Sequence, residues 1–211
     1  MTAEMHRKLY GYARASGRRA AVRVMAHMCR PLRVVVGSAT TRYPGWISTD
    51  QDILDITSEK DWSTLFRPGT IDRILCEHVL EHLSDSDSRV AIGLCARYLQ
   101  PGGVLRLAVP DGYRRDKAYR IESAPPTHGH QQFFTIDTLV PLLATAGLTV
   151  SPLEYFDAEG AFHSTGWLSA QGMIRRSVRF DRQEAFHQGD LYYTSLIVDA
   201  CRPLAPGGRH E

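Results

Sequence analysis

The chain has 211 residues, 43% of them hydrophobic and 23% charged, which is ordinary usage for a globular protein and excludes disorder throughout. A chain of this length can bury a sizeable core in one large domain. The formal net charge of +2 gives no reason to expect nucleic acid or an anionic membrane as a partner. No stretch approaches the ~20 apolar residues of a membrane-spanning helix.

The four cysteines lie far apart in the sequence and form no C-x-x-C pair. They are Cys29, Cys76, Cys95 and Cys201. This spacing argues against a disulfide framework or a zinc ribbon and fits a reducing compartment. The basic start is followed by neither an apolar run nor a small-residue cleavage site, so we expect a cytoplasmic protein without a signal peptide.

Helical spacing of apolar residues predicts a helix over residues 4–29, which Pro31 ends. Between the apolar positions lies a group of basic residues: Arg7, Lys8, Arg14, Arg18, Arg19, Arg23 and Arg30. Basic arms can bind nucleic acid, but a solvated helix face gives the same pattern. We assign residues 1–31 to an N-terminal helical arm.

Short β-branched and apolar runs predict strands at residues 32–36, 46–49, 71–76, 104–109, 148–156 and 191–201. Helices are predicted at 88–99 and 136–146, and the turn Pro101-Gly102-Gly103 follows the first of them. A turn-rich segment leads up to Gly69. This alternation indicates an α/β fold with a mainly parallel sheet covered on both faces.

Several small or acidic residues fall at or just after predicted strand ends: Gly37, Asp50, Asp55, Glu77 and Asp111. Ligands of open parallel sheets bind at the carboxyl ends of the strands. The run Gly37-Ser38-Ala39 is not a phosphate-binding loop, and Gly37 alone is explained equally well by a plain turn. Asp50 suits the two hydroxyls of a ribose, although it can also cap a turn. It follows Gly37 so closely that the intervening helix must be short or replaced by a loop.

The segment Glu77-His78-Val79-Leu80-Glu81-His82-Leu83, followed by Pro101-Gly102-Gly103, resembles class I S-adenosylmethionine-dependent methyltransferases. The run from Pro44 to Asp50 and the ending around Arg175-Arg176 resemble a bacterial subgroup of small methyltransferases. The resemblance covers roughly residues 32–202. It implies a Rossmann-like class I methyltransferase sandwich, with a mostly parallel sheet and an antiparallel last strand.

The resemblance also implies S-adenosylmethionine as the cofactor and gives seven residues a role in binding it. These are Gly37 and Ser38 under the methionine part, Asp50 at the ribose, Asp55 and Ile56 at the adenine, and Glu77 and His78 beside the sulfonium. Residues 32–203 would form the cofactor-binding domain, with 157–190 as a lid or acceptor-side insertion and 204–211 as a tail. The acceptor would be a small molecule, and the assembly state, including a homodimer, is left open.

Methyl transfer mainly requires alignment, and a base is needed only when the acceptor must lose a proton. Asp111 and Tyr113, after the strand at 104–109, are candidates, as is His130, which lies near His128 beyond Pro125-Pro126. The alternatives are that Asp111 caps a turn, that Tyr113 forms a wall of the pocket and that the loop histidines are simply solvated. No metal is expected.

Three other functions are left open. The fold also serves enzymes that cyclise or cleave S-adenosylmethionine or transfer its aminocarboxypropyl group, and the single glycine after the first strand fits a non-catalytic binding module. His78-Val79-Leu80-Glu81-His82 also matches H-x-x-E-H, the pattern of inverted zincins. That zinc hydrolase would need His78 and His82 one helical turn apart and a third ligand.

Overall fold

The computed structural model describes residues 3–181 and 194–204, with the side chains of 3–15 and 180–181 left out. In this part of the chain, seven strands form one sheet in the order β2-β1-β3-β4-β7-β5-β6. Their bounds are β1 (Arg33–Val36), β2 (Ile47–Ser48), β3 (Ile71–Glu77), β4 (Leu99–Val109), β5 (Thr149–Phe156), β6 (Phe162–Ser164) and β7 (Leu196–Cys201).

The strand directions confirm the predicted sheet. β1 pairs in parallel with β2 and β3, and β3 pairs in parallel with β4. β7 lies antiparallel between β4 and β5, so β5 runs in the same direction as β4. The predicted strand at 191–201 is seen from Leu196 onward, and 191–193 lie outside the described residues. β6 was not predicted, because its three residues are too few to show a period.

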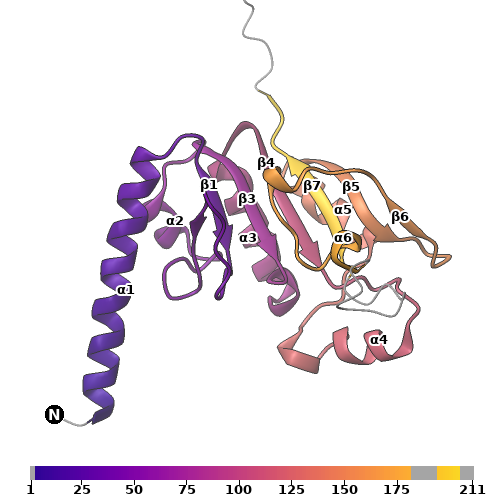
Figure 1. The fold of residues 1–211 in the computed structure, drawn as a ribbon, viewed down its shortest axis with the longest axis horizontal. Coiled ribbons are helices and arrows are strands. Elements are labelled where there is room, and N and C mark those ends of the chain that lie inside the picture. The colour runs from indigo at the N-terminus through magenta and orange to yellow at the C-terminus, as the bar shows by residue number, and fades with distance from the viewer. Residues whose placement is uncertain (1–2, 182–193, 205–211) are drawn as a thin grey trace, which may run out of the picture.

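The helices surround this sheet unevenly (Figure 1). They are α1 (Ala3–Met28), α2 (Glu59–Leu65), α3 (Asp85–Tyr98), α4 (Lys117–Ser123), α5 (Ile136–Thr145) and α6 (Val178–Asp181), with 3₁₀ turns η1 (Leu80–His82), η2 (Thr127–Gly129) and η3 (Ser169–Gln171). α1, α3 and α5 were predicted. α2 and α4 were not, because seven residues show little helical periodicity.

Successive side chains of a strand point to opposite faces, and here the two faces carry separate cores. Ile74 belongs to the larger core, which also contains buried residues of α1, α2, α3 and α5. Leu75 belongs to a smaller core that holds Val35, Ala108, Leu153, Ile174 and Ile197, with Tyr43, Trp46 and Trp167 packed against it. The first face is therefore covered by helices, whereas strand and loop residues cover the second, including the segment around Ile174.

The connection between β1 and β2, residues 37–46, contains no helix. Its ends are held by backbone hydrogen bonds in which Ser38 N–H donates to the Thr49 carbonyl and Thr49 N–H donates to that of Val35. The predicted replacement of a helix by a loop is thus observed. Both faces of the sheet are covered, as predicted, but strand and loop residues cover the second face where a helix after β1 is absent.

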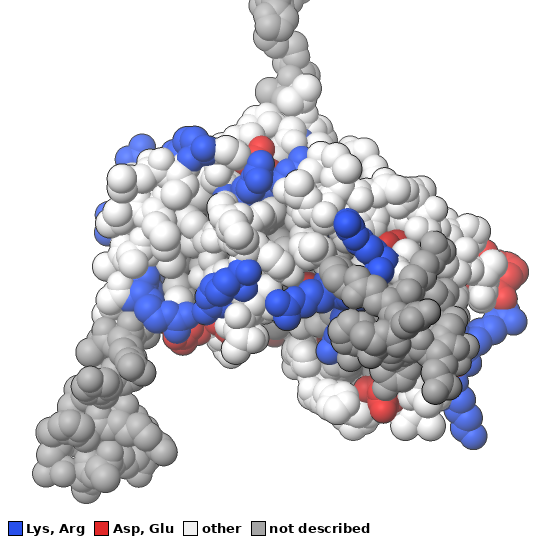
Figure 2. All heavy atoms as spheres, in the orientation of Figure 1, with Lys and Arg blue, Asp and Glu red and all other residues white. Residues whose placement is uncertain are grey.

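α1 packs beside α2 and β2 through the buried side chains of Val22 and Ala26. Two of its arginines reach the body of the protein: Arg18 pairs with Asp52 at 2.7 Å and Arg19 with Asp61 at 3.1 Å. On the face seen in Figure 2, basic side chains lie in separate groups among uncharged residues. Within the described residues, no helix is both long and apolar enough to span a bilayer.

Candidate active site

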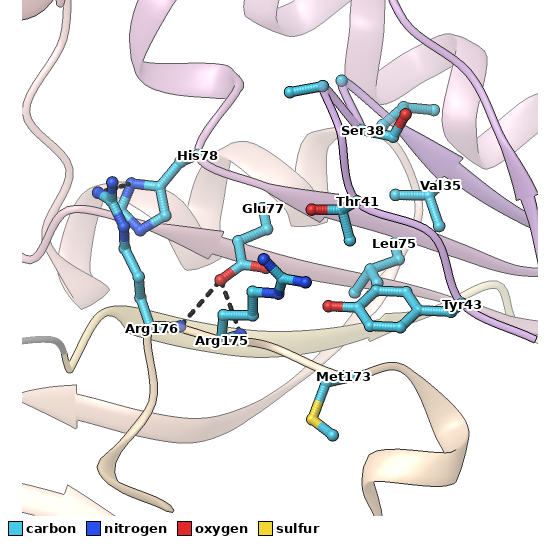
Figure 3. Close-up of a pocket in the computed structure, with 13 residues that line it drawn as sticks. Val35, Ser38, Thr41, Tyr43, Leu75, Glu77, His78, Met173, Arg175 and Arg176 are labelled. Atoms are coloured by element: carbon cyan, nitrogen blue, oxygen red, sulfur yellow. Dashed lines mark hydrogen bonds between the residues drawn. The ribbon is translucent and has the colours of Figure 1, made fainter. Parts of the chain in front are cut away.

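A cavity of about 770 Å³ opens at the carboxyl ends of β1 and β3 (Figure 3). Its lining is contributed by β1, the loop after it, the end of β3 and the segment that crosses the second face. The residues are Val35, Val36, Gly37, Ser38, Ala39, Thr41, Tyr43, Leu75, Glu77, His78, Met173, Arg175 and Arg176. Apolar side chains and backbone form most of the wall, and charged groups lie at one end, an arrangement typical of ligand sites.

Gly37 ends β1 with a φ of +60°, a conformation that residues with a Cβ rarely adopt. A Cβ at this position would also collide with the Val79 side chain. Glycine therefore lets the end of β1 approach the loop after β3, which carries His78. The requirement arises from this close packing, and it brings the two strand ends to one side of the cavity.

Glu77 ties the segment of the second face to the sheet. Its Oε1 atom accepts hydrogen bonds from the backbone N–H groups of Arg175, at 2.8 Å, and Arg176, at 2.9 Å (Figure 3). A charged acceptor makes these bonds stronger than neutral ones. The carboxylate thereby fixes the segment that forms one wall of the cavity.

Tyr43 projects into the same cavity from the loop after β1, with Met173 and Leu75 nearby (Figure 3). Its hydroxyl oxygen is buried beside the Arg175 guanidinium, but among the described residues it makes no hydrogen bond of full length and angle. Burial raises the pKa of Tyr43 and the Glu77 carboxylate raises it further, while Arg175 lowers it. A buried hydroxyl without a full hydrogen bond costs free energy, so this group is suited to bind a polar atom of a ligand.

His78 lies at the end of the cavity with a φ of +54°, which is strained for a residue other than glycine. Its Nδ1 lies 2.8 Å from Oε1 of Glu81, and its Nε2 lies 2.8 Å from Oγ of Ser195. The Glu81 carboxylate can only accept, so its shorter contact favours the proton on Nδ1, which leaves Nε2 to accept from the Ser195 hydroxyl. Nη1 of Arg176, which can only donate, also lies 3.3 Å from Nδ1, and Glu81, Ser195 and Arg176 together hold the orientation of the ring.

A second cavity of about 410 Å³ lies on the other side of His78. Its lining is rich in imidazole and carboxylate groups: His78, Glu81, His82, Pro110, Tyr119, Glu122, Ser123, His128, His130, Arg176 and Ser195. His78 and Arg176 line both cavities. The two spaces therefore adjoin at an imidazole and a guanidinium.

Residues 15–153 of the chain match the family described as methyltransferase domain. The chain belongs to this family. The match confirms the predicted family and enzyme class, and with them S-adenosylmethionine as the cofactor. It covers the strands and loops that build the first cavity, except for the segment at 173–176.

The chain is also similar to solved structures, among them three methyltransferases. A Methanosarcina mazei S-adenosylmethionine-dependent methyltransferase is 15% identical, with 76% of this chain and 68% of that one covered and a TM-score of 0.43. A Thermotoga maritima methyltransferase is 12% identical, with 94% of both chains covered and a TM-score of 0.47. The 1,6-didemethyltoxoflavin-N1-methyltransferase of Burkholderia thailandensis, with S-adenosylhomocysteine bound, is 13% identical, with coverages of 96% and 84% and a TM-score of 0.45. The comparison with curated proteins gives no match, and the family assignment rests on the sequence match.

The predicted cofactor residues of the methyltransferase fall into two groups. Gly37, Ser38, Glu77 and His78 line the first cavity, whereas Asp50, Asp55 and Ile56 do not. Oδ1 of Asp50 accepts the N–H of Gln51, and Oδ1 of Asp55 accepts both the N–H and the hydroxyl of Thr57. Ile56 is buried in the larger core, and its carbonyl accepts from Nε1 of Trp62.

The three candidate bases are also separated. His130 lines the second cavity, while Asp111 and Tyr113 line neither cavity. Asp111 is fully buried, and its two oxygens accept the N–H groups of Tyr113 and Phe156. Burial raises the pKa of Asp111 to about 6, while these two hydrogen bonds and Arg114 lower it. The Tyr113 hydroxyl donates to Asp137 at 2.6 Å.

Among the lining residues that were not predicted from the sequence, Tyr43 and Ser195 bear most on the site. Tyr43 sits in the loop that replaces a helix, and Ser195 directly precedes β7, 117 positions after His78. No motif gave either residue a role, and only the docking of distant segments brings them to the site. The one signal for Ser195 in the sequence is that a polar residue directly precedes a buried strand, because such a residue lies where the strand ends meet the ligand site.

Proposed function

We propose that the enzyme transfers a methyl group from S-adenosylmethionine, held in the first cavity, to a small polar molecule in the second. The observation that carries this proposal is that His78 and Arg176 line both cavities. A methyl donor and its acceptor must meet in line at one point. His78 and Arg176 mark the place where the two cavities adjoin, and there the methyl group of the cofactor and the acceptor atom can meet.

The first cavity fits the cofactor in size and in lining. Its volume of about 770 Å³ lies within the ordinary range for small-molecule sites. Val35, Leu75 and Met173 provide an apolar wall, and the buried Tyr43 hydroxyl provides a polar group. The bound cofactor would supply an activated methyl group.

Within that cavity, we assign Gly37 and Ser38 to the methionine part and Glu77 and His78 to the region of the sulfonium. Asp50 comes two residues after the end of β2. Its neighbour Thr49 is hydrogen-bonded to Val35 and Ser38 at the end of β1, and this placement beside the first cavity supports a role at the ribose. Asp55 and Ile56 would then lie toward the adenine. Both would require the loop after β2 to rearrange, since Ile56 packs in the core.

The second cavity favours an acceptor with an ionisable O–H or N–H group, because imidazole and carboxylate side chains dominate its wall. The acceptor's proton would pass to Oγ of Ser195 while the Ser195 hydroxyl proton passes to Nε2 of His78, so that one proton is lost by the acceptor and one is gained by the imidazole. Glu81 would stabilise the resulting imidazolium through Nδ1. His130, a predicted base, would bind the acceptor from the opposite wall.

A cytoplasmic location is part of the proposal. All four cysteines are free, and Cys29 is exposed to solvent. Unpaired thiols of this kind persist where the surroundings are reducing.

Cofactor binding and turnover test the proposal together. S-adenosylmethionine should raise the melting temperature, with a stabilisation of about 2.7 kcal/mol at 100 times Kd. With an accepted substrate, the co-product should be S-adenosylhomocysteine. Methylthioadenosine in its place would instead indicate cleavage of the cofactor or aminocarboxypropyl transfer, and the absence of any stabilisation at millimolar ligand would contradict an enzymatic use.

The shared wall has its own test. His78→Ala should lower kcat by about 10²- to 10⁴-fold, because the acceptor loses its proton acceptor. His163→Ala is the matched control, since this exposed histidine pairs with Asp157 away from both cavities. Equal activity in the two variants would refute the role of His78.

A further inference from the structure

Within the second cavity, Glu81, His82 and His130 bring three potential ligand atoms together. One carboxylate oxygen and two ring nitrogens lie within 4.8 Å of one another. The rings of His82 and His130 meet edge to face with their centroids 4.8 Å apart. We infer that these three residues bind a divalent zinc ion.

The carboxylate provides the strongest indication. Glu81 is completely buried, and Oε1 is engaged by Nδ1 of His78. Its other oxygen, Oε2, is buried without a hydrogen-bond partner among residues 3–181 and 194–204. An unpartnered buried carboxylate oxygen is costly, and a cation beside it removes that cost. Glu81 can bind zinc through Oε2 while Oε1 continues to hold His78.

His130 is presented in the form that binds a metal. Its Nδ1 lies 2.7 Å from the Ser123 carbonyl, which can only accept, so Nδ1 is protonated and the lone pair is on Nε2. Histidine ligands of metals are commonly oriented by a bond of this kind. Nε2 is therefore available to the cavity.

Backbone contacts hold the loop of His130 against the segment of the other two ligands. The N–H groups of Gln131 and Gln132 donate to the Glu81 carbonyl, and Nε2 of Gln131 donates to the carbonyl of His82 at 2.7 Å. The arrangement is thus built from two docked segments. His82 is exposed, so its ring can turn to bring its nitrogen to the spacing of zinc ligands, which is about 3.3 Å for tetrahedral bonds of 2.0–2.1 Å.

The ligand set favours zinc over alkaline-earth ions. Two imidazoles and one glutamate match catalytic zinc sites, which keep a fourth position open, whereas Mg²⁺ and Ca²⁺ prefer oxygen ligands. This site differs from the H-x-x-E-H alternative, since only Leu80–His82 are helical and His78 is bonded to Glu81 and Ser195. Glu81 is here a ligand and His78 is not.

The zinc site stands on its own geometry, but a use for it rests on the proposed function. The open fourth position would face the cavity assigned to the acceptor, beside His78. A hydroxyl, carboxylate or carbonyl oxygen of the acceptor could bind there. The acceptor class would then be a small molecule with a metal-binding oxygen.

Titration of the metal-free full chain with Zn²⁺, followed by calorimetry and metal analysis, tests the site. We expect one zinc per chain, and Co²⁺ in its place should give the visible absorption of a low-coordinate site. His82→Ala and His130→Ala should each weaken binding by at least about 100-fold. His128→Ala is the matched control, because it changes a histidine of the same loop outside the three ligands.

Unchanged zinc affinity in both ligand variants, an equal loss in His128→Ala, or no stoichiometric binding would each overturn the inference. His82 is exposed, so its variant should keep the wild-type circular dichroism spectrum, which separates loss of a ligand from loss of the fold. S-adenosylmethionine binding is measured in the same proteins. Cofactor binding without zinc refutes the metal site alone, whereas zinc binding without cofactor binding refutes the proposed function alone.

Discussion

The two faces of the sheet are covered by different means. On one face, helices contribute apolar side chains to a large core. On the other, the segment around residues 168–178 is held through its backbone by charged side chains of the strands: Arg106 bonds the carbonyls of Leu168 and Gly172, Glu77 bonds two N–H groups, and Glu154 bonds the N–H of Val178. A covering held by a few charged groups can be specific in position with little regular structure of its own. That is the face on which the first cavity opens.

Arg106 should show the largest effect when this difference is tested. It is 1% exposed, pairs with Asp199 through two bonds of 2.7 Å and lies over the Trp167 ring. Arg106→Met leaves the partly buried carboxylate of Asp199 and two backbone carbonyls of the segment without their buried partner, and it should lower the free energy of unfolding by about 3–5 kcal/mol. Urea denaturation measures the loss, and amide exchange should show residues 168–172 losing protection first.

The neighbouring residue on β4 provides the control. Leu107→Ala opens a cavity in the helix-covered core and should cost about 2–5 kcal/mol. It should not expose residues 168–172 selectively. If Arg106→Met and Leu107→Ala both increased the exchange of the amides of residues 168–172, the second face would not depend on charged side chains more than the first.

Asp111 is a buried carboxyl group that connects the loop after β4 to the end of β5 and takes no part in the hydrogen bonds that hold the segment at 168–178. Its pKa of about 6, against 3.8 ordinarily, means that the folded protein holds the proton more tightly than the unfolded chain does. Its stabilising contribution is therefore complete below pH 4 and is lost as the pH rises through 6, by up to about 3 kcal/mol. The stability of the wild type relative to Asp111→Asn should fall across that range in urea titrations. If the difference in the free energy of unfolding between wild type and Asp111→Asn stayed constant across this pH range, the pKa of Asp111 would not be raised by burial.

The two glutamates should respond differently to replacement by glutamine. Glu154 uses both oxygens, one for Nε1 of Trp167 and one for the N–H of Val178, so Glu154→Gln loses an acceptor and should cost about 1–3 kcal/mol. Glu77 bonds both N–H groups through one oxygen, which glutamine retains, so Glu77→Gln should cost less than about 1 kcal/mol. Chemical denaturation ranks the pair, and the reverse order would be inconsistent with these contacts.

The exposed ion pair of α1 should matter least. Arg18 and Asp52 lie 2.7 Å apart, but each side chain is nearly half exposed. Arg18→Ala should therefore lower stability by less than about 1 kcal/mol, with the effect shrinking in high salt. A loss comparable to that of Arg106→Met would show that the arm is tied to the body as firmly as the segment of the second face.

The sequence by itself determined the strands, the longer helices and the family. Alternating β-branched residues, helical spacing and the Pro101-Gly102-Gly103 turn are local features, so they specify structure without knowledge of distant contacts. The motif that begins at Glu77 likewise lies within one strand and its following turn. Gly37 was recognised as a strand end, although its reason, close packing against Val79, was not visible.

Only the tertiary structure decided which polar groups meet. Ser195 reaches His78 because β7 inserts between β4 and β5, and His130 reaches Glu81 because its loop docks on the backbone beside η1. Asp111, which the sequence predicted as a base, accepts hydrogen bonds from the backbone N–H groups of Tyr113 and Phe156 and lines neither cavity. Such polar contacts depend on sheet order and loop docking, which no local period encodes, so the sequence located the edge of the sheet where the site lies and the fold selected its members.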